Sequence, residues 1–290
     1  MKKAIENNKA YFTLFDGEDK AGFGSIVQAQ LILVAYCKLK NASFFFPGFK
    51  NLNHWQLEKN KSQIEFSNQL NMFLPIVVDS KKHSKSFFYK IDYNYLINCW
   101  LEFNCGRIVN ILKDIELNYE TPYFEKSKIN VVIHYRNHLK TDTDTFDRGI
   151  GDNSYYEHAI KIALSKYSLS DINFILFANR NCDFIEYLNK KYSVKSYLET
   201  SLSVTYSHFI LAEVLITSKS SLSWSAHLYG RNKLVVGRHF WHPWYKNTIL
   251  INSKGKIKLF SFYSFKIKIK SFFKLINFTI TQKHKNREVF

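Results

Sequence analysis

The feature that most constrains the fold is an alternation of short apolar runs and helical segments along residues 129–217. The first run, 129–134, is almost wholly β-branched before its polar end, as is typical of a strand buried on both faces of a parallel sheet. After it, the pattern predicts helices over 153–166, 182–192 and 207–212 and strands over 173–178, 194–198 and 214–217. This order predicts a doubly wound α/β domain over about residues 125–245.

A second α/β unit is predicted ahead of it. A strand over 11–15 is followed by a turn-rich stretch over 16–24, an apolar helical pattern over 26–39 and another apolar run over 43–46. Such a strand, glycine loop, helix and strand indicate a parallel unit whose ligand face lies at the loop. A change of pattern near 119–127 separates the two units. We therefore expect two α/β domains, 1–122 and 123–250, followed by a basic aromatic tail over 251–290.

The tail carries much of the positive charge. Residues 254–290 contain nine Lys and one Arg against one Glu, a net charge of +9 out of +17 for the whole chain. As a helix, 262–280 would place aromatic and branched side chains on one face and lysines on another, which is typical of a helix lying on an anionic membrane. The alternation of 265–270 also fits an edge strand, and a helix packed across the two domains would likewise be apolar on one side.

A glycine pair is the first candidate for ligand binding. Gly22 and Gly24 stand between the predicted strand and helix of the first unit. Without side chains, their backbone N–H groups can approach a phosphate or a sugar, and the helix N-terminus adds partial positive charge. Glycine pairs are equally common in ordinary turns, and this one lacks the full dinucleotide-binding and P-loop patterns.

The second candidate directly follows the strand at 129–134. Side chains just beyond the carboxyl end of a strand in a doubly wound sheet point into the ligand crevice, and Arg136 offers a planar fork for diphosphate oxygens there. His134 precedes it, and Arg180 occupies a similar place after the strand at 173–178. The alternatives are an interdomain salt bridge for Arg136 and a structural imidazole for His134.

The third candidate is a hydroxyl-rich turn between the strand at 214–217 and the helix that follows. Hydroxyls and exposed amides at a helix start form an anion cradle, to which a lysine adds charge. The residues concerned are Lys219, Ser220, Ser221 and Ser223. Simple N-capping by Ser220 or Ser221 is the alternative. Because the turn and Arg136 fall on the same edge of the predicted sheet, together they indicate a nucleotide diphosphate site.

These stretches, in this order, resemble those of the glycan fucosyltransferases of the α1,2, α1,6 and protein O-linked type. Gly22-Phe23-Gly24-Ser25 resembles the family's G-G-x-G-[NS]-Q block, His134-Tyr135-Arg136 its H-x-R, and Ser220-Ser221-Leu222-Ser223-Trp224 its S-S-F-S-W turn. Tyr155, Tyr156, Ala159 and Ile160 resemble a following Y-Y-x-x-A-I, and Phe240-Trp241 the terminal P-x-x-W region. The sequence departs from the family at Asn137 and His138, which replace the x-G-D that follows the arginine.

The resemblance implies two Rossmann-like domains of the GT-B type and transfer of a sugar, L-fucose from GDP-fucose in this family, to a glycan or lipid-linked oligosaccharide. In it, Arg136 binds the donor β-phosphate, with Gly22, Gly24, His134, Lys219, Ser220, Ser221 and Ser223 around the donor. We expect inverting, metal-independent chemistry with no cofactor beyond the nucleotide-sugar co-substrate. Inverting transfer needs a carboxylate base, for which Asp142 and Asp144 are the first candidates, followed by Asp147, Asp152, Glu18 and Asp19.

Other features bound the function further. The first ten residues lack the apolar stretch of a signal peptide, and no run approaches the ~18 apolar residues of a spanning helix. We therefore expect a cytoplasmic protein, peripheral on the inner face of the membrane, with four reduced cysteines. A nucleic-acid-binding protein is disfavoured because the excess charge is concentrated in the tail. A transferase for another nucleotide sugar and an inactive carbohydrate- or nucleotide-binding relative stay open.

Overall fold

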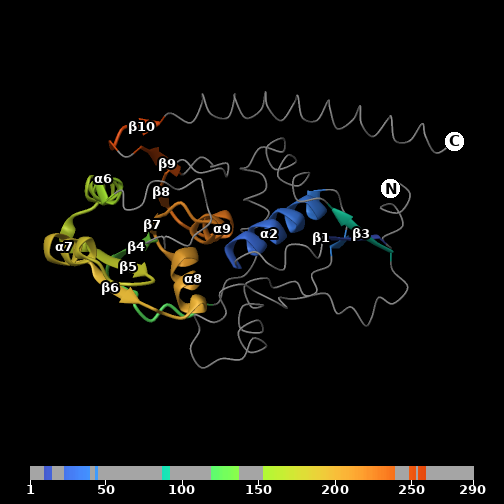
Figure 1. The fold of residues 1–290 in the computed structure, drawn as a ribbon, viewed down its shortest axis with the longest axis horizontal. Helices are drawn as coiled ribbons and strands as arrows, with labels where there is room; N and C mark the ends of the chain where they lie inside the picture. Colours follow the sequence, from blue (N-terminus) through green and yellow to red (C-terminus); the bar gives the residue numbers. More distant parts are fainter. Residues whose placement is uncertain are drawn as a thin grey trace.

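The computed structural model describes residues 10–14, 23–39, 43–44, 87–91, 119–136, 153–238, 248–252 and 254–258. These residues form an α/β fold with two β-sheets, one of three strands and one of seven (Figure 1). The predicted α/β class is confirmed.

The smaller sheet contains β1 (Ala10–Leu14), β2 (Ser43–Phe44) and β3 (Phe87–Ile91), in the order β2-β1-β3 with both pairs parallel. Helix α2 (Phe23–Leu39) lies between β1 and β2 in the chain. The strand, helix and strand predicted over 11–46 are therefore confirmed, although α2 begins three residues earlier than expected. Gly24 consequently lies in the first turn of the helix and not in the loop before it. Strand β3 was not predicted.

The larger sheet has the order β10-β9-β8-β7-β4-β5-β6, and all of its pairs are parallel except that of β10 with β9. Its strands are β4 (Ile129–Tyr135), β5 (Ile172–Ala178), β6 (Lys195–Leu198), β7 (Val214–Ile216), β8 (Leu234–Arg238), β9 (Thr248–Ile251) and β10 (Ile257–Lys258). The four strands predicted up to residue 217 are confirmed. Strands β8, β9 and β10 extend the sheet beyond them.

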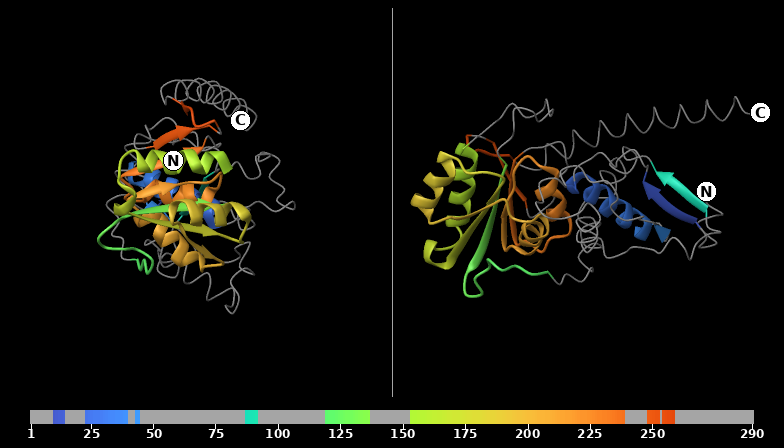
Figure 2. Two further views of the ribbon diagram at one scale, coloured as in Figure 1. Left: turned by 90° about the vertical axis from the view of Figure 1, so that its left-hand side faces the viewer. Right: turned by 60° about the horizontal axis from the view of Figure 1, so that its bottom comes forward.

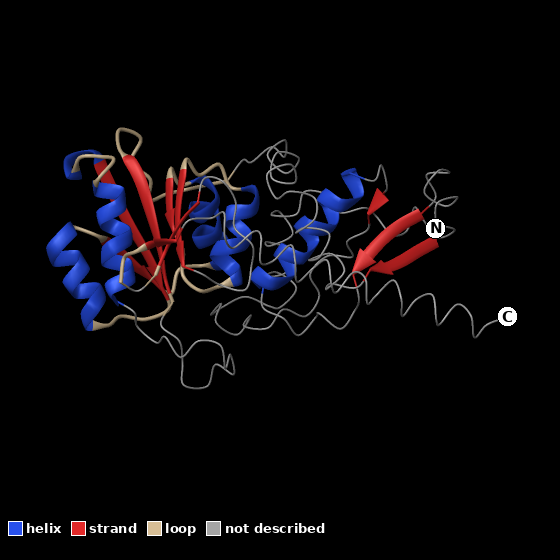
Figure 3. Ribbon diagram, turned by 90° about the horizontal axis from the view of Figure 1, so that it is seen from above, coloured by secondary structure: helices blue, strands red, loops and turns tan. Residues whose placement is uncertain are grey.

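Helices cover both faces of this sheet. Helix α6 (Asn153–Leu164) and helix α7 (Asp183–Tyr192) lie on one face, and α8 (Leu202–Leu211) and α9 (Ser221–Tyr229) lie on the other (Figures 2 and 3). Helix α2 packs against α9, so the layers run from α6 and α7 through the larger sheet to α8 and α9 and then to α2 (Figure 3). Helix α8 begins five residues before its predicted start because Ser201 caps it, its Oγ accepting from Val204 N at 3.4 Å.

The core explains why these runs become strands. Successive side chains of a strand point to opposite faces. On β4, Val131 and Ile133 are buried with the residues of α6 and α7, while His134, on the opposite face, packs its ring against Phe209 of α8 with 4.9 Å between centroids. With both faces covered, β4 must be apolar along almost its whole length, as the sequence is.

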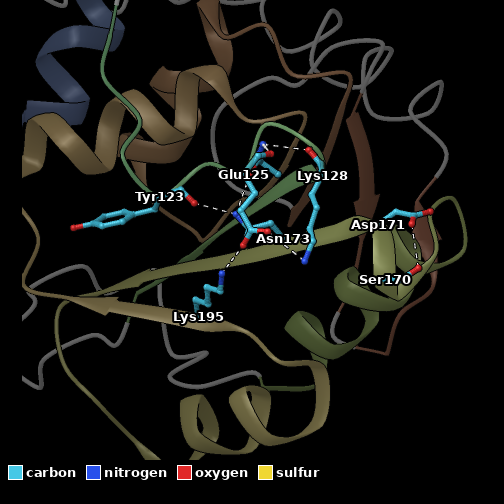
Figure 4. A network of polar contacts seen from close by, with 8 residues as sticks. Tyr123, Glu125, Lys128, Ser170, Asp171, Asn173 and Lys195 are labelled. Atoms are coloured by element: carbon cyan, nitrogen blue, oxygen red, sulfur yellow. Dashed lines mark hydrogen bonds and ion pairs between the residues drawn. The ribbon is translucent and has the colours of Figure 1, made fainter.

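The amino ends of β4 and β5 are held by a buried polar network (Figure 4). Asn173 Nδ2 donates to Asn130 Oδ1 and to the carbonyl of Tyr123, both at 3.0 Å, and Glu125 N donates to Asn130 Oδ1 at 2.9 Å. Asn130 N in turn donates to a carboxylate oxygen of Glu213 at 2.9 Å. The segment that leads into β4 is therefore fixed across this edge of the sheet.

The β9–β10 hairpin turns at Asn252, whose Oδ1 accepts from Lys254 N and Lys256 N. Gly255 has φ +71°, in the left-handed region that glycine adopts without strain, and a Cβ there would overlap the His158 ring of α6. The tail predicted from residue 251 thus starts within β9, and of its residues only 251, 252 and 254–258 are described.

Candidate functional site

Sheet topology places the candidate site at the carboxyl ends of β4 and β7. From β4 the chain continues to β5 and β6 on one side, and then crosses to β7, β8 and β9 on the other side of β4. The gap between β4 and β7 is therefore the point at which the strand order reverses. Ligands of open α/β sheets bind in the crevice outside the carboxyl ends of the strands at such a point.

Two residues predicted from the sequence lie at this point on β4. His134 is buried, and its Nδ1 is hydrogen-bonded to Ser218 Oγ at 2.9 Å, while its carbonyl accepts from Tyr156 O–H at 3.2 Å. Arg136 is half-buried, and its Nη1 donates to Ser220 Oγ at 3.4 Å. Both side chains thus reach from the end of β4 to the serine turn, 84 positions away along the chain.

The serine turn combines a helix cap with one lysine. Ser220 is the N-cap of α9, its Oγ accepting from Leu222 N at 3.2 Å, so the capping interpretation of this residue is confirmed. Lys219 and Ser221 are half-buried beside it. The Ser223 side chain is fully buried, and its Oγ has no hydrogen-bond partner among the described residues.

Gly24 brings the first turn of α2 against the first turn of α9. A Cβ at this position would lie 2.4 Å from Leu222 N and 2.7 Å from the carbonyl carbon of Ser221, so any side chain there would force the two helices to shift. Phe23 adds an edge-to-face contact with Tyr206 of α8 at 5.0 Å between centroids. Gly24 therefore allows the backbones at the N-termini of α2 and α9 to come close together. The sequence had predicted a ligand as the partner of Gly24. Gly22 lies outside the described residues.

The electrostatics of this edge favour an anion. The N-terminus of a helix carries partial positive charge, which Asp and Glu of the first turn normally complement. In the described helices that begin here, α2, α6 and α9, the first turn contains no acidic residue, whereas α7 has Asp183 and Glu186 there. Three cations, Arg136, Lys219 and Arg238, lie at the described ends of β4, β7 and β8.

Two residues of this edge had no predicted role here: Tyr155 was named only as part of a sequence motif, and Arg238 was not singled out. The O–H of Tyr155 lies 2.8 Å from the carbonyl oxygen of Thr217 and 3.1 Å from that of Val236, so it ties the ends of β7 and β8 to α6. Burial raises the pKa of Tyr155 well above its ordinary value, so its hydroxyl is a permanent donor. The guanidinium of Arg238 lies 5.2 Å above its ring. Arg238 could have been found because it ends an apolar run, as Arg136 does.

The remaining predicted residues fall elsewhere. Arg180 follows β5 and is exposed, one strand away from the reversal point. The predicted acidic residues lie outside the described residues: Asp142, Asp144, Asp147, Asp152, Glu18 and Asp19.

Among the described residues, no group of three or more His, Cys, Asp or Glu side chains is arranged to hold a metal ion. In the same part of the chain, no helix has the length and apolar character needed to cross a membrane.

No protein-family model matches the chain, and no curated protein matches it.

Proposed function

We propose that the chain is a glycosyltransferase that binds a nucleotide-sugar donor at the carboxyl ends of β4 and β7. The observation that carries the proposal is the meeting of Arg136, the capped serine turn and the acid-free N-terminus of α9 at the reversal point of the sheet. A planar guanidinium and helix N-terminal amides are the groups that hold phosphate oxygens. The order of the motifs, which resembles that of the fucosyltransferases, points to GDP-fucose as donor.

The same groups account for the chemistry. As the bond from the sugar to the diphosphate breaks, negative charge develops on the departing oxygens. Fixed positive groups that face this charge stabilise the transition state without rearranging. In the proposed reaction Arg136 and the amides of α9 have this role without a metal, and Asp142 or Asp144 removes the proton from the attacking acceptor hydroxyl.

The proposed architecture is of the GT-B type, with two Rossmann-like domains. Residues 123–250 hold the nucleotide, residues 1–122 present the acceptor and residues 251–290 form a basic tail. Support comes from the parallel strand–helix–strand unit of β1, α2 and β2 and from the contact of Gly24 with Leu222. That contact brings the first unit to the donor edge, where an acceptor has to lie.

The proposed acceptor is a surface glycan or a lipid-linked oligosaccharide, reached from the cytoplasmic face of the membrane. The described start of the tail supports this location, because Lys254 and Lys256 are exposed and Ile257 is 62% exposed on the β9–β10 hairpin. Lysines flanking an exposed apolar side chain suit an anionic lipid surface. Unchanged sedimentation with anionic vesicles after truncation at Asn252 would contradict this part of the proposal.

Thermal unfolding with GDP, UDP, CMP and ADP tests the donor site. A ligand at 100 times its Kd stabilises the folded state by about 2.7 kcal/mol, which raises the Tm by roughly 4–5 °C for a chain of this size. We expect GDP to give the largest rise and Arg136→Ala to abolish it. Arg231→Ala is the matched control, because Arg231 is exposed near the opposite end of β8. A larger rise in Tm with another nucleotide would support the donor site but would contradict GDP-fucose as the donor.

Turnover completes the test. Release of GDP from GDP-fucose in the presence of a glycan acceptor is expected from the wild-type chain and not from Arg136→Ala. Loss of turnover on addition of a chelator would refute the metal-independent mechanism. If GDP binds but no sugar is transferred to any acceptor in a glycan panel, the chain is a nucleotide-binding relative and the proposed activity is wrong.

A further inference from the structure

Arg238 has a position that sets it apart from the other cations of the larger sheet. It is the last residue of β8, it is half-buried, and its guanidinium carbon lies 5.2 Å above the centre of the Tyr155 ring. A guanidinium at this distance from the face of a tyrosine ring is attracted to it electrostatically. The contact therefore fixes the position of the Arg238 guanidinium at the end of β8.

Tyr155 connects this cation to the serine turn. Its O–H approaches the carbonyl oxygen of Thr217, the residue that begins the turn, and that of Val236, two residues before Arg238. The ring under the guanidinium is thus fixed to the ends of both β7 and β8. Arg238 is held beside the same turn that Arg136 reaches from β4.

The sheet register places the two arginines on either side of the end of β7. Ile216 of β7 is paired with Ile133 of β4 and with Val236 of β8, so these three residues lie side by side across the sheet. Arg136 comes three residues after Ile133, and Arg238 comes two residues after Val236. At about 4.8 Å per strand, β4 and β8 are about 10 Å apart. Arg136 contacts the cap of α9 on one face of the sheet, and Arg238 contacts α6 on the other face. An anion above the end of β7 would be approached from both sides.

Resting on the donor site proposed above, we propose that Arg238 is a second phosphate-binding residue, so that Arg136 and Arg238 together hold a diphosphate across the end of β7. Two forks on opposite sides suit two linked phosphates better than one. The site should therefore prefer a diphosphate to a monophosphate, and either arginine alone should bind the diphosphate weakly.

Binding of inorganic pyrophosphate and orthophosphate to the full chain tests this at fixed ionic strength by titration calorimetry. These probes report on the phosphates alone, whichever base or sugar the donor carries. We compare the wild type with Arg238→Gln, Arg238→Lys and Arg136→Gln, and use Arg231→Gln as the matched control. Loss of a hydrogen bond from a charged donor weakens binding by about 10- to 100-fold. We expect that loss for pyrophosphate in Arg238→Gln and Arg136→Gln, a smaller loss in Arg238→Lys and none in Arg231→Gln.

The outcomes separate this inference from the proposed function. Unchanged pyrophosphate affinity in Arg238→Gln, with a loss in Arg136→Gln, overturns the role of Arg238 and leaves the donor site standing. Equal losses for orthophosphate and pyrophosphate in Arg238→Gln overturn the two-sided diphosphate clamp. No binding of either anion by the wild type overturns the donor site and this inference together. The Tm of each variant without ligand shows that a loss of affinity is not a loss of folding.

Discussion

His208 should make the protein sensitive to mild acid. This side chain of α8 is fully buried among the rings of Tyr123, Phe124 and Phe177. Its Nδ1 donates to the carbonyl of Val204 at 2.7 Å, and its Nε2 accepts from Tyr123 N at 3.3 Å. Both nitrogens are therefore engaged by the neutral ring, and burial lowers the pKa from 6.5 to about 4.

The sign and size of the effect follow from proton linkage. Below pH 6.5 the unfolded chain binds a proton at His208, whereas the folded chain does not bind it until about pH 4. Stability is therefore lost as the pH falls through this range. With these two pKa values the loss is about 2 kcal/mol at pH 5 and about 3 kcal/mol at pH 4.

Urea unfolding at pH 7 and pH 5, followed by tryptophan fluorescence, measures this loss. His208→Gln is the comparison, because a glutamine can still accept from Tyr123 N but does not titrate. The chain has ten histidines, so only the difference between wild type and variant is assigned to His208. The wild type should lose about 2 kcal/mol more than His208→Gln over this interval. Equal losses would show that His208 is protonated in the folded state and would refute the argument.

Three further substitutions test the packing of the site. Gly24→Ala should lower the free energy of unfolding by about 1–3 kcal/mol, because the new Cβ overlaps the backbone of α9 even though alanine favours helix; an unchanged Cm in urea, or an equal drop in the Ser25→Ala control, would contradict the contact. Ser220→Ala removes the cap of α9 and should cost about 1 kcal/mol in chemical denaturation. Tyr155→Phe should also cost about 1 kcal/mol, since the carbonyl of Thr217 loses its donor; a difference below about 0.3 kcal/mol in urea would exclude that bond.

Much of the fold could be predicted because a strand that is buried on both faces of a sheet is apolar at most of its positions. Residues 129–134 and 173–178 are mostly apolar, and both became interior strands of the larger sheet. The start of α8 was missed because the polar residues near Ser201 resemble a loop, although a serine cap and a helix begin there. Strand β8 was missed because only three apolar residues precede Gly237, and a glycine inside a strand weakens the strand pattern.

The candidate site could be predicted only in part. Arg136 and Ser220 follow strand ends, and parallel strands bring their carboxyl ends to one edge, so a sequence argument could pair them. The contact of Gly24 could not be predicted in this way, because its partner Leu222 is almost 200 positions away along the chain. Leu222 also belongs to α9, which covers the larger sheet, whereas α2 follows a strand of the smaller sheet. The role of Tyr155 depends on two backbone carbonyl groups, and a sequence pattern of side chains does not show where backbone groups lie.

The central place of β4 has a consequence for how the molecule opens. Both neighbours of β4 are parallel strands and its residues 130–135 are buried, whereas β6 at one edge carries exposed Lys195 and Leu198. Local opening starts where few apolar contacts have to be broken. Amide hydrogens of β6 should therefore exchange with deuterium early and those of β4 late. Arg136 follows directly after β4, so its attachment point would persist through the fluctuations that loosen the edges of the sheet.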